Sequence, residues 1–283
     1  MSETGRATAP GAGTVLNALA THRGAAFAID VETTAIVERR QSGITGAIEG
    51  DADTDTALIE RCVELAAATT DADLGGAHVR TESDVPTAAG LKSSSAAANA
   101  AVLATLDLLD ERMEPADAAR LGVRAARETG VTATGAFDDA GASMLGGLVV
   151  TDNDDDELLK RDAVDWDVLV WTPPERAHSA DADVTRCERI APMAELAFEL
   201  AMAGDYGRAM TVNGLAFSAA LAFPTEPAVE AMPHAAGVSL SGTGPSVLAV
   251  GERATLEPVA ERWRRRDGRT WFTRTRTEGA RQG

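Results

Sequence analysis

The stretch "DVPTAAGLKSSSAAANAAVLATLDLL", residues 84–109, decides how the fold of the whole chain is interpreted. It runs from a proline through a glycine turn into three serines and then a long alanine-rich helix. A glycine turn at the start of a helix presents unpaired backbone N–H groups and the positive end of the helix dipole in one place. The serine hydroxyls add further donors. The stretch therefore predicts an anion site, and phosphate is the usual anion at such a site.

A second interpretation of the same stretch needs no ligand. Ser93, Ser94 and Ser95 would then cap a helix that packs closely through its alanines, since serine is a common N-cap residue. A Walker A loop is excluded, because it needs G-x-x-x-x-G-K-S/T and the order here is Gly-Leu-Lys-Ser. Composition alone leaves the phosphate site and the capped helix open.

Lys92 favours the phosphate site. Lys92 and Lys160 are the two lysines among 26 Lys and Arg residues, so nearly all other positive charge is arginine. A lysine beside the serines indicates a site that needs a compact ammonium rather than a wide planar fork. Retention of this lysine by chance is the alternative.

The composition excludes some classes of function. The 283 residues are enough for two domains, and 45% hydrophobic residues are ordinary for a soluble protein. Asp and Glu number 44, which gives a net charge of −18 and argues against binding the phosphate backbone of nucleic acid. The acidity favours a surface adapted to high salt.

The N-terminus lacks the pattern of a signal peptide, and the chain has no long apolar run, so we expect no membrane partner and a cytoplasmic location. Cys62 and Cys187 have no pairing signature, which fits a reducing compartment, and the scattered histidines make a zinc site improbable. The sequence makes no prediction of oligomeric state.

Periodicity predicts a mixed α+β chain of two domains. The acidic run "DNDDDELLKRD", residues 152–162, is expected to be a solvated loop between domains 1–155 and 156–283, and it lacks EF-hand spacing for calcium. Strands are expected within 24–40, 77–86, 148–152, 167–171, 237–252 and 270–277, and helices within 57–70, 93–109, 114–130, 192–222 and 256–268.

The segment "PTAAGLKSSSAA" resembles the phosphate-binding motif P-x-x-x-G-L-G-S-S-A-A of the GHMP kinases, the superfamily of galactokinase, homoserine kinase and mevalonate kinase. Lys92 replaces the second glycine of the motif, and Ser95 replaces an alanine. The variant G-L-K-S-S-S-A is similar to the archaeal shikimate kinases, and an acidic, arginine-rich chain would suit a salt-loving member of that branch.

The resemblance implies ATP and Mg²⁺ as cofactors, with Lys92 offsetting charge on the transferred group and Ser94 holding the metal. The residues expected to bind ATP are Pro86, Thr87, Ala88, Ala89, Gly90, Leu91, Lys92, Ser93, Ser94, Ser95 and Ala96.

Two further segments resemble GHMP motifs. "SLSGTGPSVLAV", residues 239–250, is similar to the third motif, so Gly242 and Gly244 are candidates for binding the substrate. Alone, this glycine pair is typical of a hairpin turn, and it lacks the third glycine of a Rossmann fingerprint. "GAGTVLNALATHRGAAFAID" is similar to the first motif, which makes Asn17 and Arg23 candidates for the acceptor pocket.

The segment "TGAFDDAGAS", residues 134–143, matches the place where several GHMP kinases supply an aspartate that accepts the proton of the acceptor hydroxyl. Asp138 fits that role, with Asp139 where the family often has Asn or Gln. The alternative is that Asp138 or Asp139 only caps a following helix.

The resemblance as a whole implies a two-domain GHMP kinase fold. Its N-terminal mixed α/β domain would have a left-handed crossover, as in ribosomal-protein-like folds, and its C-terminal domain would be a ferredoxin-like sandwich. The implied activity is transfer of the γ-phosphoryl group of ATP to the 3-hydroxyl of shikimate, a small-molecule partner. Homoserine kinase, mevalonate kinase and a non-catalytic metabolite-binding protein on the same scaffold are the alternatives.

Overall fold

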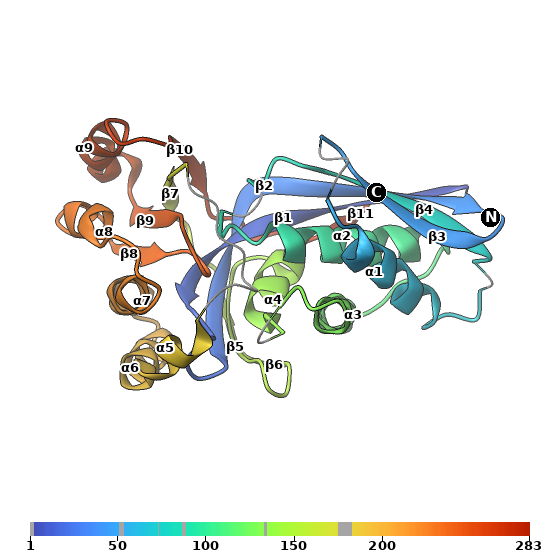
Figure 1. Cartoon of the computed structure of the whole chain (residues 1–283), viewed down its shortest axis with the longest axis horizontal. Coiled ribbons are helices and arrows are strands. Elements are labelled where there is room, and N and C mark those ends of the chain that lie inside the picture. Colours follow the sequence, from blue (N-terminus) through green and yellow to red (C-terminus); the bar gives the residue numbers. More distant parts are fainter. Residues whose placement is uncertain (1–2, 51–53, 73, 87–88, 133–134, 175–182) are drawn as a thin grey trace.

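The computed structural model of the chain describes residues 3–50, 54–72, 74–86, 89–132, 135–174 and 183–283, which form two β-sheets covered by helices (Figure 1). The strands are β1 (Thr4–Leu16), β2 (Arg23–Arg40), β3 (Gly43–Ile48), β4 (Gly76–Ser83), β5 (Leu148–Asp152), β6 (Glu157–Asp162), β7 (Asp167–Thr172), β8 (Gly237–Leu240), β9 (Val247–Gly251), β10 (Arg269–Arg274) and β11 (Arg281–Gln282). The helices are α1 (Ala57–Ala67), α2 (Ser93–Leu108), α3 (Pro115–Glu128), α4 (Phe137–Leu145), α5 (Val184–Glu188), α6 (Ala191–Met202), α7 (Tyr206–Ala220), α8 (Glu226–Ala231) and α9 (Arg253–Trp263).

The first sheet is built around β2, which changes partner along its length. The order of the strands is β11-β1-β2-β4-β3, and β5 pairs with both β2 and β6. Residues 23–27 of β2 pair with β5, whereas residues 33–40 pair with β4. Strands β3 and β4 are parallel and are joined through α1, and the other pairs are antiparallel. The first residues of β2 therefore lie beside β5, close to α4.

Helix α2 packs closely on the first sheet (Figure 1). Small side chains allow this approach, since Ala96, Ala100, Ala101 and Ala104 are all fully buried. Gly5 of β1 is equally important, because a Cβ there would lie 2.1 Å from the carbonyl oxygen of Ala104. Any side chain at this position would push the helix off the strand. The contact with β1 fixes the axis of α2 and hence the position of its N-terminus.

The second sheet has the order β10-β7-β9-β8 and is antiparallel throughout. Alternate residues of β7 pack into two different hydrophobic cores, because successive side chains of a strand point to opposite faces of the sheet. Leu169 faces a core shared with α8 and α9 around the buried Trp263. Val168 and Val170 face a core that also contains Phe27 of the first sheet. This shared core holds the two sheets together.

The two sheets with their helices confirm the predicted α+β class, and most expected elements are present within a few residues of their predicted limits. One prediction was wrong. Residues 157–162 of the acidic run form strand β6 rather than a solvated loop, because they pair with β5 while Leu158 packs against the core. A division at 155/156 would fall in the turn of this hairpin, and both its strands belong to the first sheet. The exact limits of the domains, the left-handed crossover and the ferredoxin-like description stay predictions.

In the part of the chain that the structure describes, no helix combines the length and the apolar character needed to cross a lipid bilayer.

Candidate active site

The predicted phosphate loop joins β4 to the start of α2. Thr87 and Ala88 lie outside the described residues. Gly90 has a φ of +76°, a conformation that residues with a Cβ rarely adopt. A Cβ at Gly90 would also lie 2.1 Å from the carbonyl oxygen of Ser241, in the turn after β8. Both the backbone conformation and the close contact therefore require glycine in this loop.

Lys92 occupies the N-cap position of α2, in a left-handed conformation with φ 65° and ψ 34°. No side chain caps this helix, and the backbone N–H of Ala96 donates to the carbonyl of Lys92. The alternative of a serine-capped helix is therefore wrong. The N–H groups of residues 93–95 precede the first intrahelical bond, so they have no partner within the helix and point toward its positive end. They are available to an anion.

The side chain of Lys92 lies between α4 and the turn after β8. Its Nζ is 2.8 Å from Oδ1 of Asp139, and only 8% of the side chain is exposed. A Cβ at Gly242 would lie 2.8 Å from the same Nζ. The ammonium is therefore confined on one side by a carboxylate and on the other by glycine backbone.

Asp138 lies in the first turn of α4 and is 3% exposed. Its Oδ1 accepts a hydrogen bond of 2.9 Å from Nδ2 of Asn153, and a Cβ at Gly24 of β2 would lie 2.4 Å from its Cγ. Burial, followed by the charge of Asp139, raises the pKa of Asp138 to about 7, although Lys92 and Asn153 act in the opposite direction. A carboxyl group that titrates near neutral pH is well suited to accept a proton.

The N-cap position of α4 is Ala136, and no side chain caps the helix. The alternative that Asp138 or Asp139 is the N-cap residue is therefore wrong. Instead, both carboxylates and Lys92 line one pocket. The residues lining it are Asn17, Ala18, Leu19, Lys92, Thr132, Ala136, Asp138, Asp139, Gly242 and Thr243.

Hydrogen bonds connect the three segments that resemble family motifs. Oγ of Ser241 donates to the carbonyl of Gly90 at 2.8 Å, which ties the third segment to the phosphate loop. The N–H of Gly242 donates to Oγ1 of Thr14, and Nδ2 of Asn17 donates to the carbonyl of Gly242, both at 2.8 Å. Segments that are far apart in the sequence thus meet at one place beside the start of α2.

Two other candidates for substrate binding lie elsewhere. Arg23 pairs with Glu195 at 3.0 Å, with its guanidinium 4.7 Å from the centre of the Phe198 ring, and it does not line the pocket. Gly244 faces Phe223, since a Cβ there would lie 2.6 Å from that ring. The roles of Arg23 and Gly244 in binding stay predictions.

Two buried amides at the site were not predicted from the sequence. Oδ1 of Asn213 accepts from the N–H of Asn17 at 2.8 Å, so α7 fixes the first segment. Asn153 holds Asp138, as described above. A signal for Asn153 was present, because it is the one amide in a run of acidic residues and an amide can donate to a carboxylate. We find no such signal for Asn213.

A hydroxyl oxygen at the start of α2 is the candidate ligand for Mg²⁺. Among the described residues, no group of three or more His, Cys, Asp and Glu side chains is arranged to hold a metal ion. Ser94 carries this hydroxyl and is exposed at the start of α2. Oxygen ligands of this kind fit Mg²⁺, which usually takes one or two protein ligands and completes its shell with phosphate and water.

Known proteins resemble the chain over nearly its whole length. The family model described as the GHMP kinases N terminal domain matches residues 57–147. A protein from Halobacterium salinarum named shikimate kinase is 63% identical over 98% of this chain and 99% of its own length. Another of that name, from Methanosarcina mazei, is 52% identical over 93% of this chain and 90% of its own length.

Solved structures share the fold. A homoserine kinase from Cytophaga hutchinsonii gives a TM-score of 0.78 at 17% identity and covers 100% of this chain and 98% of its own. The mevalonate kinase of Methanococcus jannaschii also gives 0.78, at 14% identity, and covers 95% of this chain and 98% of its own. These two likenesses concern the fold alone. The full-length relatives, together with the family model, show that the chain belongs to the GHMP kinases, in the branch of the archaeal shikimate kinases.

Proposed function

We propose that this protein is an ATP-dependent shikimate kinase, which transfers the γ-phosphoryl group of ATP to the 3-hydroxyl of shikimate. The observation that carries the proposal is the identity of 63% with a protein of that name over nearly the whole of both chains. The pocket beside α2 supports it, because one place combines free helical N–H groups, a confined ammonium and a carboxyl group that titrates near neutral pH.

The start of α2 would bind the phosphates of ATP. Residues 90–96 would wrap around them, with the N–H groups of the first turn donating to phosphate oxygens at the positive end of the helix. The Lys92 ammonium would offset charge on the transferred group, since stabilising such charge supplies much of the catalysis of phosphoryl transfer. Asp139, which pairs with Lys92, would keep the ammonium in place when no ATP is bound.

Asp138 would serve the acceptor. As the hydroxyl oxygen bonds to phosphorus and ADP leaves, the proton of that hydroxyl passes to the Asp138 carboxylate. A pKa of about 7 leaves the carboxyl partly ionised at neutral pH and still basic enough to accept the proton. Asn17 and Gly242 line the same pocket, and we propose that these two help to bind shikimate; Arg23 and Gly244, which do not line it, are further candidates.

Mg²⁺ would neutralise charge on the phosphates when bound. Ser94 is the side chain that we propose to hold it, because its hydroxyl is exposed at the helix end where the phosphates would lie. The rest of its shell would come from phosphate and water.

We also propose a cytoplasmic location in a cell with high internal salt. Both cysteines, Cys62 and Cys187, are free, as is usual in a reducing compartment. The net charge of −18 and the relative from Halobacterium salinarum support the adaptation to salt.

A panel of acceptors tests the proposed substrate. Shikimate, homoserine and mevalonate are each supplied with ATP and Mg²⁺, at low and at molar potassium chloride, and ADP release is measured. We expect turnover with shikimate and faster turnover at molar salt. Turnover of homoserine or mevalonate with none of shikimate would overturn the substrate. Absence of turnover with all three would favour a non-catalytic binding protein.

Asp138→Asn tests the proposed base. We expect kcat to fall by about 10² or more, which is the usual contribution of a general base to the rate, while the affinity for ATP stays nearly unchanged. Asp205→Asn is the control, because Asp205 forms an exposed ion pair with Arg208 at 3.0 Å, at the start of α7. Equal kcat values for the Asp138 variant and the wild type would remove Asp138 from the mechanism.

A further inference from the structure

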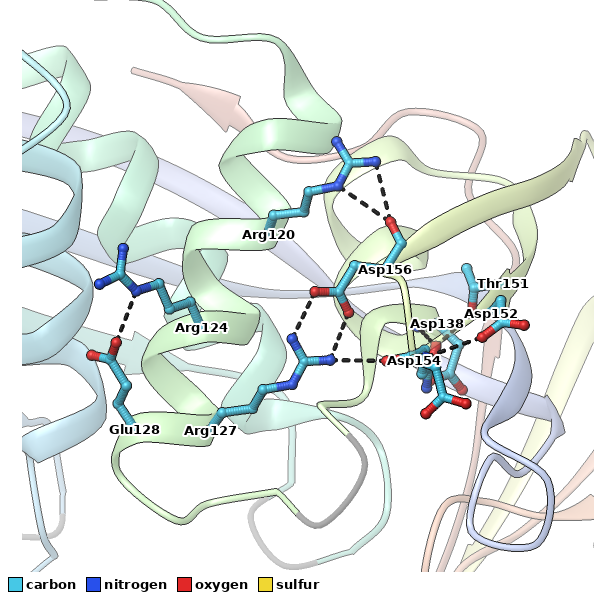
Figure 2. Close-up of polar contacts among 10 residues, drawn as sticks. Arg120, Arg124, Arg127, Glu128, Asp138, Thr151, Asp152, Asp154 and Asp156 are labelled. Carbon is cyan, nitrogen blue, oxygen red and sulfur yellow. Dashed lines mark hydrogen bonds and ion pairs between the residues drawn. The ribbon is translucent and has the colours of Figure 1, made fainter.

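The turn between β5 and β6 touches the proposed base (Figure 2). Although it lies in the acidic run, its Asn153 is only 1% exposed. Oδ1 of Asn153 accepts from Oγ1 of Thr151 at 2.7 Å and from the N–H of Asp138 at 3.3 Å. An amide oxygen can accept these two hydrogen bonds and the amide nitrogen cannot, so the orientation of the amide is fixed. Nδ2 therefore faces the Asp138 carboxylate, to which it donates at 2.9 Å.

Helix α3 holds this turn in place. Figure 2 shows Arg127 reaching from α3 to Asp156, with each terminal nitrogen 2.7 Å from one carboxylate oxygen. Nη2 of Arg127 also donates to the carbonyl of Asn153 at 2.9 Å. Arg120, two turns earlier on α3, donates to the carbonyl of Asp156 from two nitrogens, at 3.2 and 3.1 Å. Paired contacts of this kind fix direction as well as distance.

Arg127 also lies against the segment that leads into α4. Gly135 has a φ of +86°, and a Cβ there would lie 2.2 Å from Nη2 of Arg127. The guanidinium therefore occupies the space between this segment and the turn after β5. One side chain thus sets the distance between the two pieces of backbone that carry Asp138 and Asn153.

We propose that Asn153, held by Arg127, is the positioning residue of the Asp138 carboxylate and favours its ionised form. The inference rests on the proposed function, in which Asp138 receives the proton of the acceptor. Neither residue touches a reacting atom, and both act through Asp138. The acidic run beside β5 then has a role in catalysis that its composition does not indicate.

The charges that face Asp138 decide the direction of the expected effect. Asp139 on its own helix raises the pKa of Asp138, and Lys92 at the start of α2 lowers it. The turn after β5 contributes the uncharged Asn153, whose N–H donates to the carboxylate and lowers the pKa. Arg127 reaches the carbonyl of Asn153 rather than Asp138 itself. Removing the Asn153 donor should therefore raise the pKa of Asp138.

The first test is the variant Asn153→Ala, for which two quantities are measured, the pKa of Asp138 and the dependence of kcat on pH. The pKa of Asp138 is measured by ¹³C carboxyl NMR in the protein without substrates, with the resonance assigned by its loss in Asp138→Asn. We expect the pKa of Asp138 to rise by about one unit. At a pH well below the pKa of Asp138 in both the wild type and the variant, this rise lowers the ionised fraction of Asp138 about tenfold. The acidic limb of the kcat profile should move to higher pH by the same amount, with the KM for ATP nearly unchanged. An unmoved pKa in Asn153→Ala would overturn the proposal.

The second variant, Asn153→Asp, separates positioning from folding. A second carboxylate at this place should hold a shared proton with Asp138, so activity should be low at neutral pH and recover as the pH rises. A variant that had merely lost its structure would show no recovery. Loss of activity at every pH, with the NMR pKa of Asp138 unmoved, would count against positioning by Asn153.

The third test compares two arginines of one helix. Arg124 lies on α3 and pairs with Glu128 at 2.8 Å, pointing away from the turn (Figure 2). We expect Arg127→Ala to raise the pKa of Asp138 and to lower kcat several-fold at neutral pH, and Arg124→Ala to change neither. Arg127→Lys should restore only part of the loss, because an ammonium cannot make the paired contact. Equal results for Arg124→Ala and Arg127→Ala would overturn the role of Arg127.

The NMR measurement needs no substrate, so it separates two kinds of failure. If the acceptor panel shows no turnover of shikimate, the proposed function fails while the shift in the pKa of Asp138 still decides the positioning. If turnover is normal and Asn153→Ala leaves the pKa unmoved, only the positioning fails.

Discussion

The two lysines of the chain lie in regions that differ in how completely their charge is satisfied. Lys160 lies on β6, where its Nζ is 3.2 Å from Oδ2 of Asp162 and donates to the carbonyl of Met202 at 3.1 Å. It also lies 5.1 Å from the centre of the Tyr206 ring. Lys92, among the described residues, forms an ion pair with Asp139 alone and faces a pocket.

The difference indicates which ammonium can bind a ligand. An ammonium has three donors. Those of Lys160 are occupied by groups at the end of α6 and on its own strand, and Tyr206 donates its hydroxyl to the same Asp162. Lys92 keeps donors for a further acceptor, beside the free N–H groups at the start of α2. A Lys–Asp ion pair can therefore be structural in one region and available for phosphate in another.

The largest difference in kcat between the two regions is expected when each lysine is replaced by an uncharged residue. We expect Lys92→Met to lower kcat by about 10² to 10³, the cost of removing one donor to developing charge. Lys160→Met should leave kcat nearly unchanged and lower the free energy of unfolding by about 1 kcal/mol or less, as for an exposed ion pair. Steady-state kinetics and thermal unfolding of both variants test this. Comparable losses of kcat in the two variants would remove the distinction.

Exchanging each lysine for arginine keeps the positive charge and changes the shape of the head group. The Lys92 ammonium lies close to Gly242, where even a Cβ would be 2.8 Å away, so a wide guanidinium would have to displace the turn after β8. We expect Lys92→Arg to lower kcat about tenfold or more, since lysine and arginine are not interchangeable at a confined site.

Lys160→Arg is the matched control. Lys160 is 24% exposed, and the solvent side leaves room for a larger head group. Wild-type kinetics in Lys92→Arg would show that the site needs a positive charge and not a compact ammonium.

Local patterns and resemblance singled out Gly90, Lys92 and Asp138 from the sequence, and the structure places Lys92 and Asp138 in one pocket beside the start of α2; their roles stay predictions. Those patterns are local because a glycine turn and a helix start are built from consecutive residues. Two of the alternatives left open, that serines cap α2 and that Asp138 or Asp139 caps α4, were excluded only by the structure. The identity of an N-cap residue depends on backbone conformation, which propensity does not fix.

The features that the sequence did not predict come from contacts between distant segments. Asn153 is buried because the β5–β6 hairpin folds back onto α4, and the ion pair of Arg127 with Asp156 joins α3 to the same turn. By composition the run from 152 to 162 is solvated and acidic, so we predicted a loop. Half of it became strand β6 because pairing with β5 overrode that preference.

The smallest expected effect concerns Asp139 and Asp162, the carboxylates that pair with the two lysines. For Asp139 it depends on the direction in which the pKa of Asp138 shifts. Burial and then the charge of Asp139 raise the pKa of Asp138, so Asp139→Asn should lower that pKa. The ionised form of Asp138 would then persist to lower pH, and the acidic limb of the kcat profile should move down. The ratio of kcat at pH 6 to kcat at pH 8 should therefore rise by about a few-fold, in line with a shift of less than one unit.

Asp162→Asn is the control for this last change, because Asp162 pairs with the other lysine and, among the described residues, is not one of the groups that shift the pKa of Asp138. Its pH profile should match the wild type, whereas the melting temperatures of both variants should fall, since each leaves an ammonium with fewer partners. If Asp139→Asn moved the acidic limb upward instead, the main effect of Asp139 would be to hold Lys92 near Asp138. The two lysine regions would then differ in how the carboxylate is used as well as in how the ammonium is exposed.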